Sequence, residues 1–331
     1  MALAEKAAIH YDPFLSIKWP MFGPTVTMKK NPIFLLALGI CLLTIIAYAS
    51  GVFETHVTTL ELPEFHVDAA AVRTIAVLTP AIHLRLSESN GAWRLDEPMT
   101  APADSNVVSR FVHSMSSLTP ESIVSTNIDR YSEYGVDSTA QKIILGKSSG
   151  DSIQVVLGRQ GPDYQSVYVR IAKDPRVIMA KGPVILPKDT DAWRDKVMMN
   201  AGAPSVIQSA EVSNGDEQYI VRSDHGQWKL DTKGATLNAD SAAVSRWLGR
   251  FNPLRADGFI PDLALDAVRK GATGHIKMET IDGKPVELWL QKRSKDIAAV
   301  SSTGGDVYKL YSYHQSNLLP DSGSLKAKKK K

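Results

Sequence analysis

Two stretches of the chain carry nearly the same pattern of hydrophobic and polar positions. One reads GAWRLDEPMTAPADSNVVSRF from Gly91, and the other reads GQWKLDTKGATLNADSAAVSRW from Gly226. In each stretch, hydrophobic residues alternate with polar ones on both sides of a turn that contains the glycine, and this period of two predicts a β-hairpin. Trp93 and Trp228 fall at matching positions of the two hairpins.

A helix is predicted after each hairpin. Asp104 and Asp240 each stand in an Ala-Asp-Ser triplet, where an aspartate can cap the first amides of a helix. The segment after Asp104 has one apolar face at helical spacing, made of Val107, Val108, Phe111, Val112, Met115 and Leu118. Adding 136 to these numbers gives another apolar set, which is Ala243, Val244, Trp247, Leu248, Phe251 and Leu254. Arg110 and Arg246 correspond in the same way. The chain is therefore internally duplicated.

The segments that follow the two predicted helices alternate again, and each half gains two more hairpins. These segments are residues 142–158 and 166–181 in the first half and residues 275–291 and 297–312 in the second. A hairpin, a helix and an antiparallel meander make an α+β unit with the helix on one face of the sheet. The predicted fold class is therefore α+β: a single N-terminal transmembrane helix followed by two tandem α+β repeats, at residues 71–200 and 204–320.

The transmembrane helix is predicted from an uncharged, apolar run at residues 31–53. Its 23 residues are enough to cross a hydrocarbon core of about 30 Å as a helix. Lys29 and Lys30 precede the run and acidic residues follow it, so the positive-inside rule places the N-terminus in the cytoplasm and the body outside. The alternative is a cleaved secretory signal with small residues at Ala47 and Ala49, which would also export the body. We expect a retained anchor because the apolar run is long.

The predicted topology determines how the segments outside the transmembrane helix and the two repeats are interpreted. Residues 1–30 become a cytoplasmic arm in which Met28 could itself be the start, and residues 54–70 become a stalk. An arm rich in aromatic residues suits an irregular segment on the membrane interface or on a partner subunit; an unstructured leader is the alternative. Residues 321–331 are expected to form a basic, solvated tail, with weak attachment to anionic lipid head groups as the alternative.

Charge and cysteine content narrow the classes of function. The net charge is +3, with +2 in residues 1–53 and +5 in residues 326–331, which leaves −4 for residues 54–325. A mildly acidic body argues against a nucleic-acid partner, because binding phosphates requires a basic face. Cys41 is the single cysteine, so no intramolecular disulfide can form. Its place in the apolar run favours a small buried hydrophobe over a reactive thiol.

No catalytic, cofactor-binding or metal-binding residue is predicted. Gly146-Lys147-Ser148 resembles the end of a phosphate-binding loop, but position 141 is glutamine where that loop needs glycine, and no helix is predicted to follow. One candidate metal cluster lies in the stalk and consists of His56, Glu61, Glu64 and His66. Metal binding there would need a folded loop to bring the ligands together, so a solvated stalk is the simpler interpretation.

Trp93 and Trp228 could in principle stack against a ligand. Because they occupy equivalent places in two repeats and face a helix, a core position explains them more simply. The residues singled out are therefore marks of the repeat structure, and they are Gly91, Trp93, Asp104, Arg110, Gly226, Trp228, Asp240 and Arg246.

Several short motifs of the chain resemble the DUF4340 family. They are Gly-x-Trp-Arg-Leu with the Ala-Asp cap, Tyr134-Gly135-Val136-Asp137, Leu157-Gly158, Tyr168-Val169-Arg170 and Trp193-Arg194-Asp195-Lys196. The resemblance spans about residues 28–315 and rests on turns, caps and core aromatics rather than on an active-site signature. It implies a bacterial protein with an N-terminal helix in the inner membrane and a periplasmic repeat domain. Members of the family often lie beside genes for gliding-type ABC transporter permeases and their auxiliary subunits.

The expected function follows from the duplication, the predicted anchor and this resemblance. We expect a membrane-anchored extracytoplasmic interaction module that is auxiliary to an ABC-type transporter. The alternative is a structural accessory subunit of a larger integral membrane complex. In either case the expected partners are integral membrane protein subunits, and the lipid bilayer through residues 31–53. We expect no enzymatic activity, no cofactor and no nucleic-acid partner.

Overall fold

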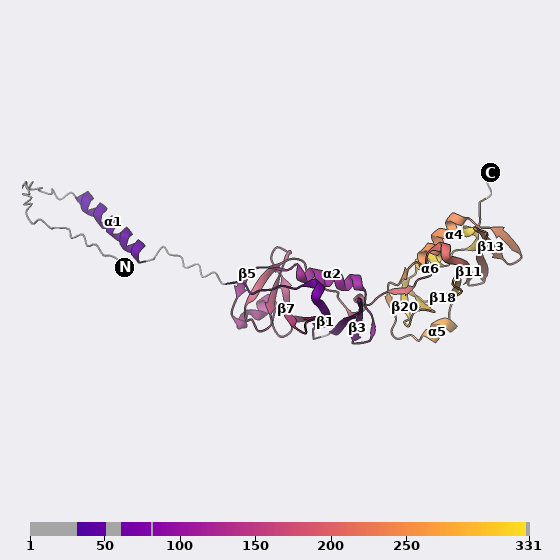
Figure 1. Cartoon of the computed structure of the whole chain (residues 1–331), viewed down its shortest axis with the longest axis horizontal. Helices are drawn as coiled ribbons and strands as arrows, with labels where there is room; N and C mark the ends of the chain where they lie inside the picture. Colours follow the sequence, from indigo (N-terminus) through magenta and orange to yellow (C-terminus); the bar gives the residue numbers. More distant parts are fainter. Residues whose placement is uncertain (1–31, 51–60, 81, 329–331) are drawn as a thin grey trace, which may run out of the picture. The chain divides into compact units, whose positions relative to one another are not determined.

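The computed structural model describes residues 32–50, 61–80 and 82–328. The chain divides into two compact units, residues 1–60 and residues 61–331. The first unit contains helix α1 (Pro32–Ala49), and the second contains all the sheets (Figure 1). The predicted arm at residues 1–30 and residues 54–60 of the predicted stalk lie outside the described residues.

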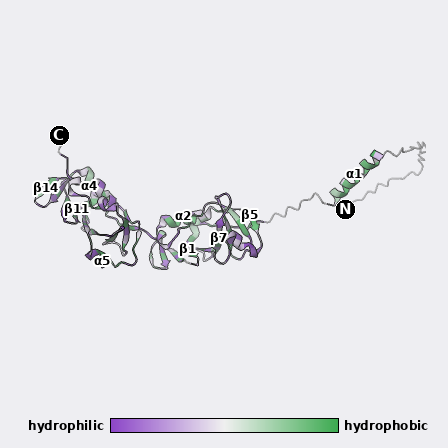
Figure 2. Cartoon of the chain, turned by 180° about the vertical axis from the view of Figure 1, so that it is seen from behind, coloured by the Kyte–Doolittle hydropathy of each residue, from purple (hydrophilic) through white to green (hydrophobic). Residues whose placement is uncertain are grey.

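Helix α1 corrects the prediction of a membrane span. It has 18 residues and ends at Ala49, so at 1.5 Å per residue it is about 27 Å long, less than the roughly 30 Å of a hydrocarbon core. No helix in the described part of the chain is long and apolar enough to cross a membrane. The hydrophobic colour of α1 in Figure 2 reflects the composition that prompted the prediction. The predicted transmembrane helix is therefore wrong, and so are the inner-membrane location and the topology derived from it.

The second unit is built mainly from β-sheet. Within residues 61–80 and 82–328 there are two nine-stranded sheets, in which all neighbouring strands are antiparallel. The first sheet has the spatial order β4 (Ala101–Pro102), β3 (Ala92–Glu97), β2 (His83–Ser89), β1 (Val72–Leu78), β6 (Gln141–Lys147), β7 (Ser152–Gln160), β8 (Ser166–Ile171), β9 (Val177–Lys181) and β5 (Thr119–Ser125).

The second sheet repeats this order strand for strand. It runs β14 (Ala235–Asn238), β13 (Gln227–Thr232), β12 (Glu217–Asp224), β11 (Ile207–Asn214), β17 (Gly274–Thr280), β18 (Pro285–Lys292), β19 (Asp296–Ser301), β20 (Tyr308–Tyr311) and β16 (Gly258–Phe259). We call residues 69–195 repeat 1 and residues 204–328 repeat 2. Even irregularities recur: the register shifts between Val72 and Thr74 in repeat 1 and between Ile207 and Ser209 in repeat 2.

The predicted α+β class is wrong in its balance, because each half consists mostly of one nine-stranded antiparallel sheet and has a single longer helix. The reason is a strand that the hairpin pattern did not include. β1 pairs with β2 of the hairpin on one side and with β6 of the meander on the other, and β11 does the same in repeat 2. The hairpin and the meander are thereby joined into one sheet.

One longer helix accompanies each sheet. These are α2 (Ser105–Ser116) and α4 (Ser241–Leu248) (Figure 1). The apolar face of α2 packs into a core with strand residues such as Leu86 and Ile143, and α4 packs into a second core with Val221 and Ile276.

Short elements complete the second unit. The helical ones are η1 (Ala69–Ala71), η2 (Ile128–Arg130), α3 (Tyr131–Tyr134), η3 (Thr190–Ala192), η4 (Pro204–Val206), η5 (Gly249–Phe251), α5 (Leu265–Lys270), α6 (His314–Leu318) and α7 (Ser322–Leu325). In addition, β10 (Val197–Met199) and β15 (Leu254–Arg255) form a two-stranded sheet. Leu325 of α7 is buried in the second core, so repeat 2 continues into the segment that the sequence assigned to the basic tail.

Candidate functional site

The turn glycines occupy equivalent backbone positions. Gly91 has φ of 80° and Gly226 has φ of 81°, and the residues before them, Asn90 and His225, also have positive φ. Two consecutive positive φ values define the turn that suits a two-residue hairpin loop, and glycine adopts the second of them without strain. Both glycines therefore have a conformational role in the hairpins.

The helix caps are equivalent as well. Asp104 accepts hydrogen bonds from the N–H groups of Asn106 and Val107, and Asp240 accepts them from Ala242 and Ala243. The backbone angles agree closely, with φ/ψ of −74°/103° at Asp104 and −75°/102° at Asp240. Arg110 and Arg246 lie exposed on α2 and α4, and they join no interaction with the candidate site described below.

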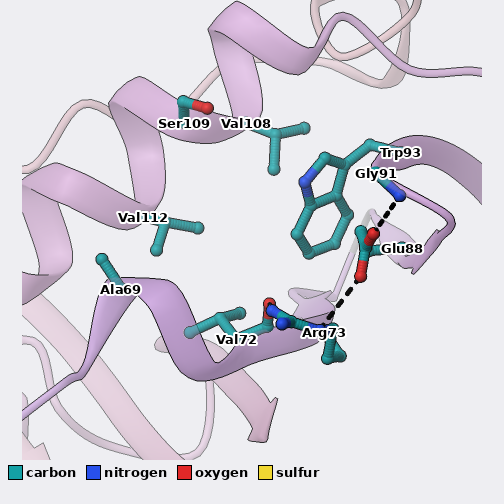
Figure 3. A pocket seen from close by; sticks show the side chains of 9 residues that line it. All are labelled: Ala69, Val72, Arg73, Glu88, Gly91, Trp93, Val108, Ser109 and Val112. Carbon is teal, nitrogen blue, oxygen red and sulfur yellow. Dashed lines mark hydrogen bonds and ion pairs between the residues drawn. The ribbon is translucent and has the colours of Figure 1, made fainter. Parts of the chain in front are cut away.

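Trp93 and Trp228 are half-buried and pack against the cores of their repeats. In repeat 1 the indole of Trp93 also points into a pocket of about 290 Å³ between α2 and β1 (Figure 3). Arg73 and Glu88 line this pocket and form an ion pair of 3.1 Å, and Glu88 also accepts a hydrogen bond from the Gly91 amide. The ion pair thus fixes the hairpin turn against β1.

The two repeats are joined by a set of contacts that we call the seam, and Arg194 lies at its centre. This arginine follows Trp193 at the end of repeat 1, and its side chain is only 5% exposed. Its guanidinium donates to Asp306 of repeat 2 at 2.7 Å and lies over the ring of Phe259, also in repeat 2, at 3.5 Å from the ring centre. A desolvated guanidinium over an aromatic ring is a favourable contact.

A second arginine crosses the seam in the opposite direction. Arg255 of repeat 2 donates to Asp104 of repeat 1 at 2.5 Å, and it lies 3.6 Å from Asp195. Asp104 uses its Oδ1 atom to cap α2 and its Oδ2 atom to bind Arg255. One carboxylate therefore fixes the start of α2 and holds repeat 2 at the same time.

Backbone pairing supports these side-chain contacts. The connecting strand β10 pairs with β15, and the Ala256 N–H donates to the carbonyl of Lys196 at 2.8 Å. The Ala201 N–H likewise donates to the carbonyl of Phe251 at 2.8 Å. Hydrogen bonds of this kind restrict the connection between the repeats, which therefore does not behave as a flexible linker.

A cleft of about 550 Å³ lies at the seam. Repeat 1 contributes Thr100, Ala101 and Pro102 to its wall; the connection contributes Asp195 and residues 197–200; repeat 2 contributes residues 303–306 and Tyr308. Clefts between packed modules are common sites of ligand binding. We take this seam cleft as the candidate functional site.

The chemistry of the seam cleft is that of hydrogen bonding. The ion pairs of Asp195 and Asp306 use their Oδ1 atoms, and within the described ranges neither Oδ2 atom accepts a hydrogen bond. Burial raises the pKa of Tyr308, so this phenol stays protonated near neutral pH and can donate a hydrogen bond. Met198 and Met199 are buried, with about 1% of each exposed, so the accessible apolar part of the lining comes from Pro102 and Val197.

Groups suited to metal binding are not brought together in the parts of the chain that the structure describes, which hold no cluster of three or more His, Cys, Asp or Glu side chains with suitable geometry. Residue His56 of the stalk cluster considered above lies outside the described residues. The lowered carboxylate pKa values belong to surface groups such as Asp137 and Asp163, where hydrogen bonds from Thr139 and Ser166 stabilise the charged form.

Most residues of the seam are not recognisable from the sequence. Arg194 and Asp195 lie in a quoted motif, but their partners Asp306 and Arg255 are far along the chain and at no characteristic spacing. Asp104 is predicted only as a helix cap, and nothing in its local sequence indicates that it also binds Arg255.

The family assignment follows from a sequence comparison. Residues 93–271, more than half of the chain, match the family described as "Domain of unknown function (DUF4340)". The chain belongs to the DUF4340 family. The matched segment includes Asp104, Arg194 and Arg255, so both seam arginines lie within the DUF4340 region, whereas Asp306 lies outside it. No curated protein and no solved structure shows significant similarity to the chain.

Proposed function

We propose that this DUF4340 protein is a binding module without enzymatic activity, whose seam cleft takes up a segment of a partner protein. The observation that carries the proposal is that the ion pairs of Arg194 and Arg255 hold the two repeats together at this cleft. A cleft whose walls are fixed in advance loses little conformational entropy when a partner binds, and this favours affinity.

The lining favours a polypeptide segment as the ligand. Free carboxylate oxygens on Asp195 and Asp306 can accept hydrogen bonds from backbone or side-chain N–H groups. Pro102 and Val197 offer accessible apolar atoms against which an apolar side chain of the segment can pack. Charge in the cleft is balanced, because each aspartate already faces an arginine, so recognition would depend on hydrogen bonding and shape rather than on net charge.

The identity of the partner is the less direct part of the proposal. On the family resemblance, we propose a subunit of an ABC-type transporter as the partner. The alternative role is that of a structural accessory of a larger complex, whose subunits would order the aromatic arm at residues 1–30; this arm lies outside the described residues. Recovery of transporter subunits with the protein favours the first role, and recovery of an unrelated complex favours the second.

Blocking the cleft tests the proposal. Gly305 lines the cleft, and a β-carbon at this position meets no atom within 4 Å. Gly305→Trp should therefore fill the cleft without disturbing the fold, and Ser149→Trp in an exposed turn of repeat 1 is the matched control. After mild crosslinking and affinity purification, the partner should be recovered with the wild type and with Ser149→Trp but not with Gly305→Trp. Equal recovery with all three proteins would refute the proposed site.

A further inference from the structure

The far end of repeat 2 reproduces the surface by which repeat 1 holds repeat 2. In repeat 1, Asp104 N–H donates to Trp193 and Asp195 N–H donates to Pro102. These two N···O distances are 2.8 and 2.9 Å. In repeat 2 the equivalent bonds run from Asp240 to Leu325 at 2.8 Å and from Ala327 to Asn238 at 3.0 Å, so each distance is within 0.1 Å of its counterpart. We call this second copy of the surface the end surface, and it consists of Thr236, Leu237, Asn238, Asp240 and Lys326.

The segment that completes each surface, residues 193–195 in repeat 1 and 325–327 in repeat 2, is also duplicated. An isolated bridge pairs Ala103 with Arg194 in repeat 1, and an equivalent bridge pairs Ala239 with Lys326 in repeat 2. Lys326 therefore occupies the place of Arg194, as Asp240 occupies the place of Asp104. A cation beside a cap aspartate is the arrangement that holds the seam together.

The two copies of the surface differ in whether side chains of another repeat are bound to them. Asp104 Oδ2 binds Arg255, and Arg194 binds Asp306 and covers Phe259. Toward the described residues, Asp240 accepts hydrogen bonds only through Oδ1, which caps α4, and Lys326 is exposed. Among residues 32–50, 61–80 and 82–328, no side chain forms an ion pair with either of them.

We propose that the end surface is a docking site for a protein domain that presents an arginine to Asp240 and an aromatic ring with a neighbouring carboxylate to Lys326. This is the chemistry with which Arg255, Phe259 and Asp306 of repeat 2 meet repeat 1. The occupied seam is the direct support, because the same backbone frame and the same pair of charge signs recur at the end surface. The proposal concerns a different surface from the seam cleft and stands independently of it.

A second copy of this chain does not fit the description. Positions 119, 123 and 176 of repeat 1 correspond to Arg255, Phe259 and Asp306, and they hold Thr119, Ile123 and Arg176. Arg176 would face Lys326 with like charge, and it is already bound to Asp174 and to the carbonyl of Glu61. The partner is thus a different protein, whose docking face carries an arginine and a carboxylate at the positions where repeat 1 has Thr119 and Arg176.

A three-repeat chain tests whether the end surface can hold such a face. Residues 196–328 are joined a second time directly after Ala327, so that a copy of Arg255, Phe259 and Asp306 follows the end surface as it follows the seam. We expect the added repeat to dock, giving a smaller radius of gyration in X-ray scattering than a version with a glycine-serine linker before the added repeat. Asp240→Asn together with Lys326→Glu should abolish the difference, whereas Asp216→Asn in an exposed turn should not. An added repeat that moves independently in the parent fusion would overturn the proposal.

The natural partner is tested on the full chain by photocrosslinking. p-Benzoyl-phenylalanine replaces Lys328, whose counterpart Lys196 contacts repeat 2 through its carbonyl. The crosslinked partner peptide should lie beside an arginine, and Asp240→Asn should lower the crosslinking yield by about tenfold or more, as expected for loss of a charged hydrogen bond. Asp216→Asn is the control. Crosslinking that is unaffected by Asp240→Asn, or a failure to crosslink any protein, would contradict the proposal.

Discussion

The two repeats share one backbone frame, yet they fill it with different side chains. Each core contains one buried tryptophan and an edge-to-face aromatic pair, but repeat 1 uses Phe111 with Trp193 and repeat 2 uses Trp247 with Phe251. Trp247 stands on the helix where repeat 1 has Phe111. Leu325, the last residue of α7, stands where repeat 1 has Trp193. The indole that follows the sheet in repeat 1 is thus found on the helix in repeat 2, and the exchange keeps the total side-chain volume of the core nearly constant.

The repeats also differ in what their ends contact. The end of repeat 1 is occupied by repeat 2 through Arg194 and Arg255, whereas the equivalent end of repeat 2 carries exposed Lys326. The comparison shows that the core residues and the contact residues of the two repeats have diverged separately. A substitution in the core is offset by another core substitution, whereas residues on the surface differ according to whether another repeat contacts them.

The largest expected effect tests the exchanged tryptophan. Trp193→Ala should lower the free energy of unfolding by about 4 kcal/mol, because a fully buried aromatic side chain leaves a large cavity. Trp193→Leu should cost less, and adding Phe111→Trp should restore part of the loss by copying the arrangement of repeat 2. Urea unfolding followed by circular dichroism measures these differences. If the double variant is less stable than Trp193→Leu alone, the two cores are not equivalent in packing.

The next effect tests the seam against its counterpart. Arg194→Ala should destabilise the protein by about 2–3 kcal/mol, because a buried guanidinium loses its ion pairs with Asp191 and Asp306 and its contact with Phe259. Both carboxylate partners are partly exposed, which keeps the loss below that of a fully buried pair. Lys326→Ala should change stability by less than about 0.5 kcal/mol. Calorimetry should also resolve two unfolding transitions in Arg194→Ala if the seam couples the repeats; equal effects of the two substitutions would contradict the comparison.

The helix caps provide a smaller test. Asp240→Ala should cost about 1 kcal/mol, the usual value for losing an aspartate cap. Asp104→Ala should cost roughly 1 kcal/mol more, because Asp104 also binds Arg255. Asparagine keeps a capping oxygen, so Asp240→Asn should leave the free energy of unfolding nearly unchanged. Asp104→Asn should still lower it by the part that comes from the ion pair with Arg255. Thermal unfolding of the four variants measures the difference, and indistinguishable Asp104 and Asp240 variants would show that the Arg255 contact contributes nothing.

The smallest expected effect is a pH dependence in repeat 1. Hydrogen bonds from the Arg176 guanidinium lower the pKa of Asp174. Because the pKa in the folded state lies below the unfolded value of about 3.9, the stabilisation is fully present above that value and is lost as the pH falls through the folded pKa. Asp174→Asn should therefore lower stability by less than about 1 kcal/mol at pH 6, since both side chains are partly exposed. The difference from the wild type should shrink toward pH 2; a difference that is constant with pH would contradict the assignment.

The duplication, the turns and the caps could be read from the sequence, because each depends on residues close together in the chain. A period of two, a glycine at a positive φ and an aspartate before a helix are local features with local physical causes. The apolar faces of α2 and α4 follow in the same way from helical spacing, and Phe111 and Trp247 are buried as that spacing predicts. The family resemblance rested on the same kind of local motif.

Only the tertiary structure decided how these local elements combine. The joining of hairpin and meander into one sheet depends on hydrogen bonds between β1 and β6, which are far apart in the sequence. Hydropathy alone also did not fix the length of α1, because it does not show where the helix ends. The seam depends on Arg194 and Asp306, whose separation of 112 residues leaves no spacing signal, and on a burial that only the packed repeats create. An ion pair of this kind is set by which surfaces meet, and no local pattern in the chain carries that information.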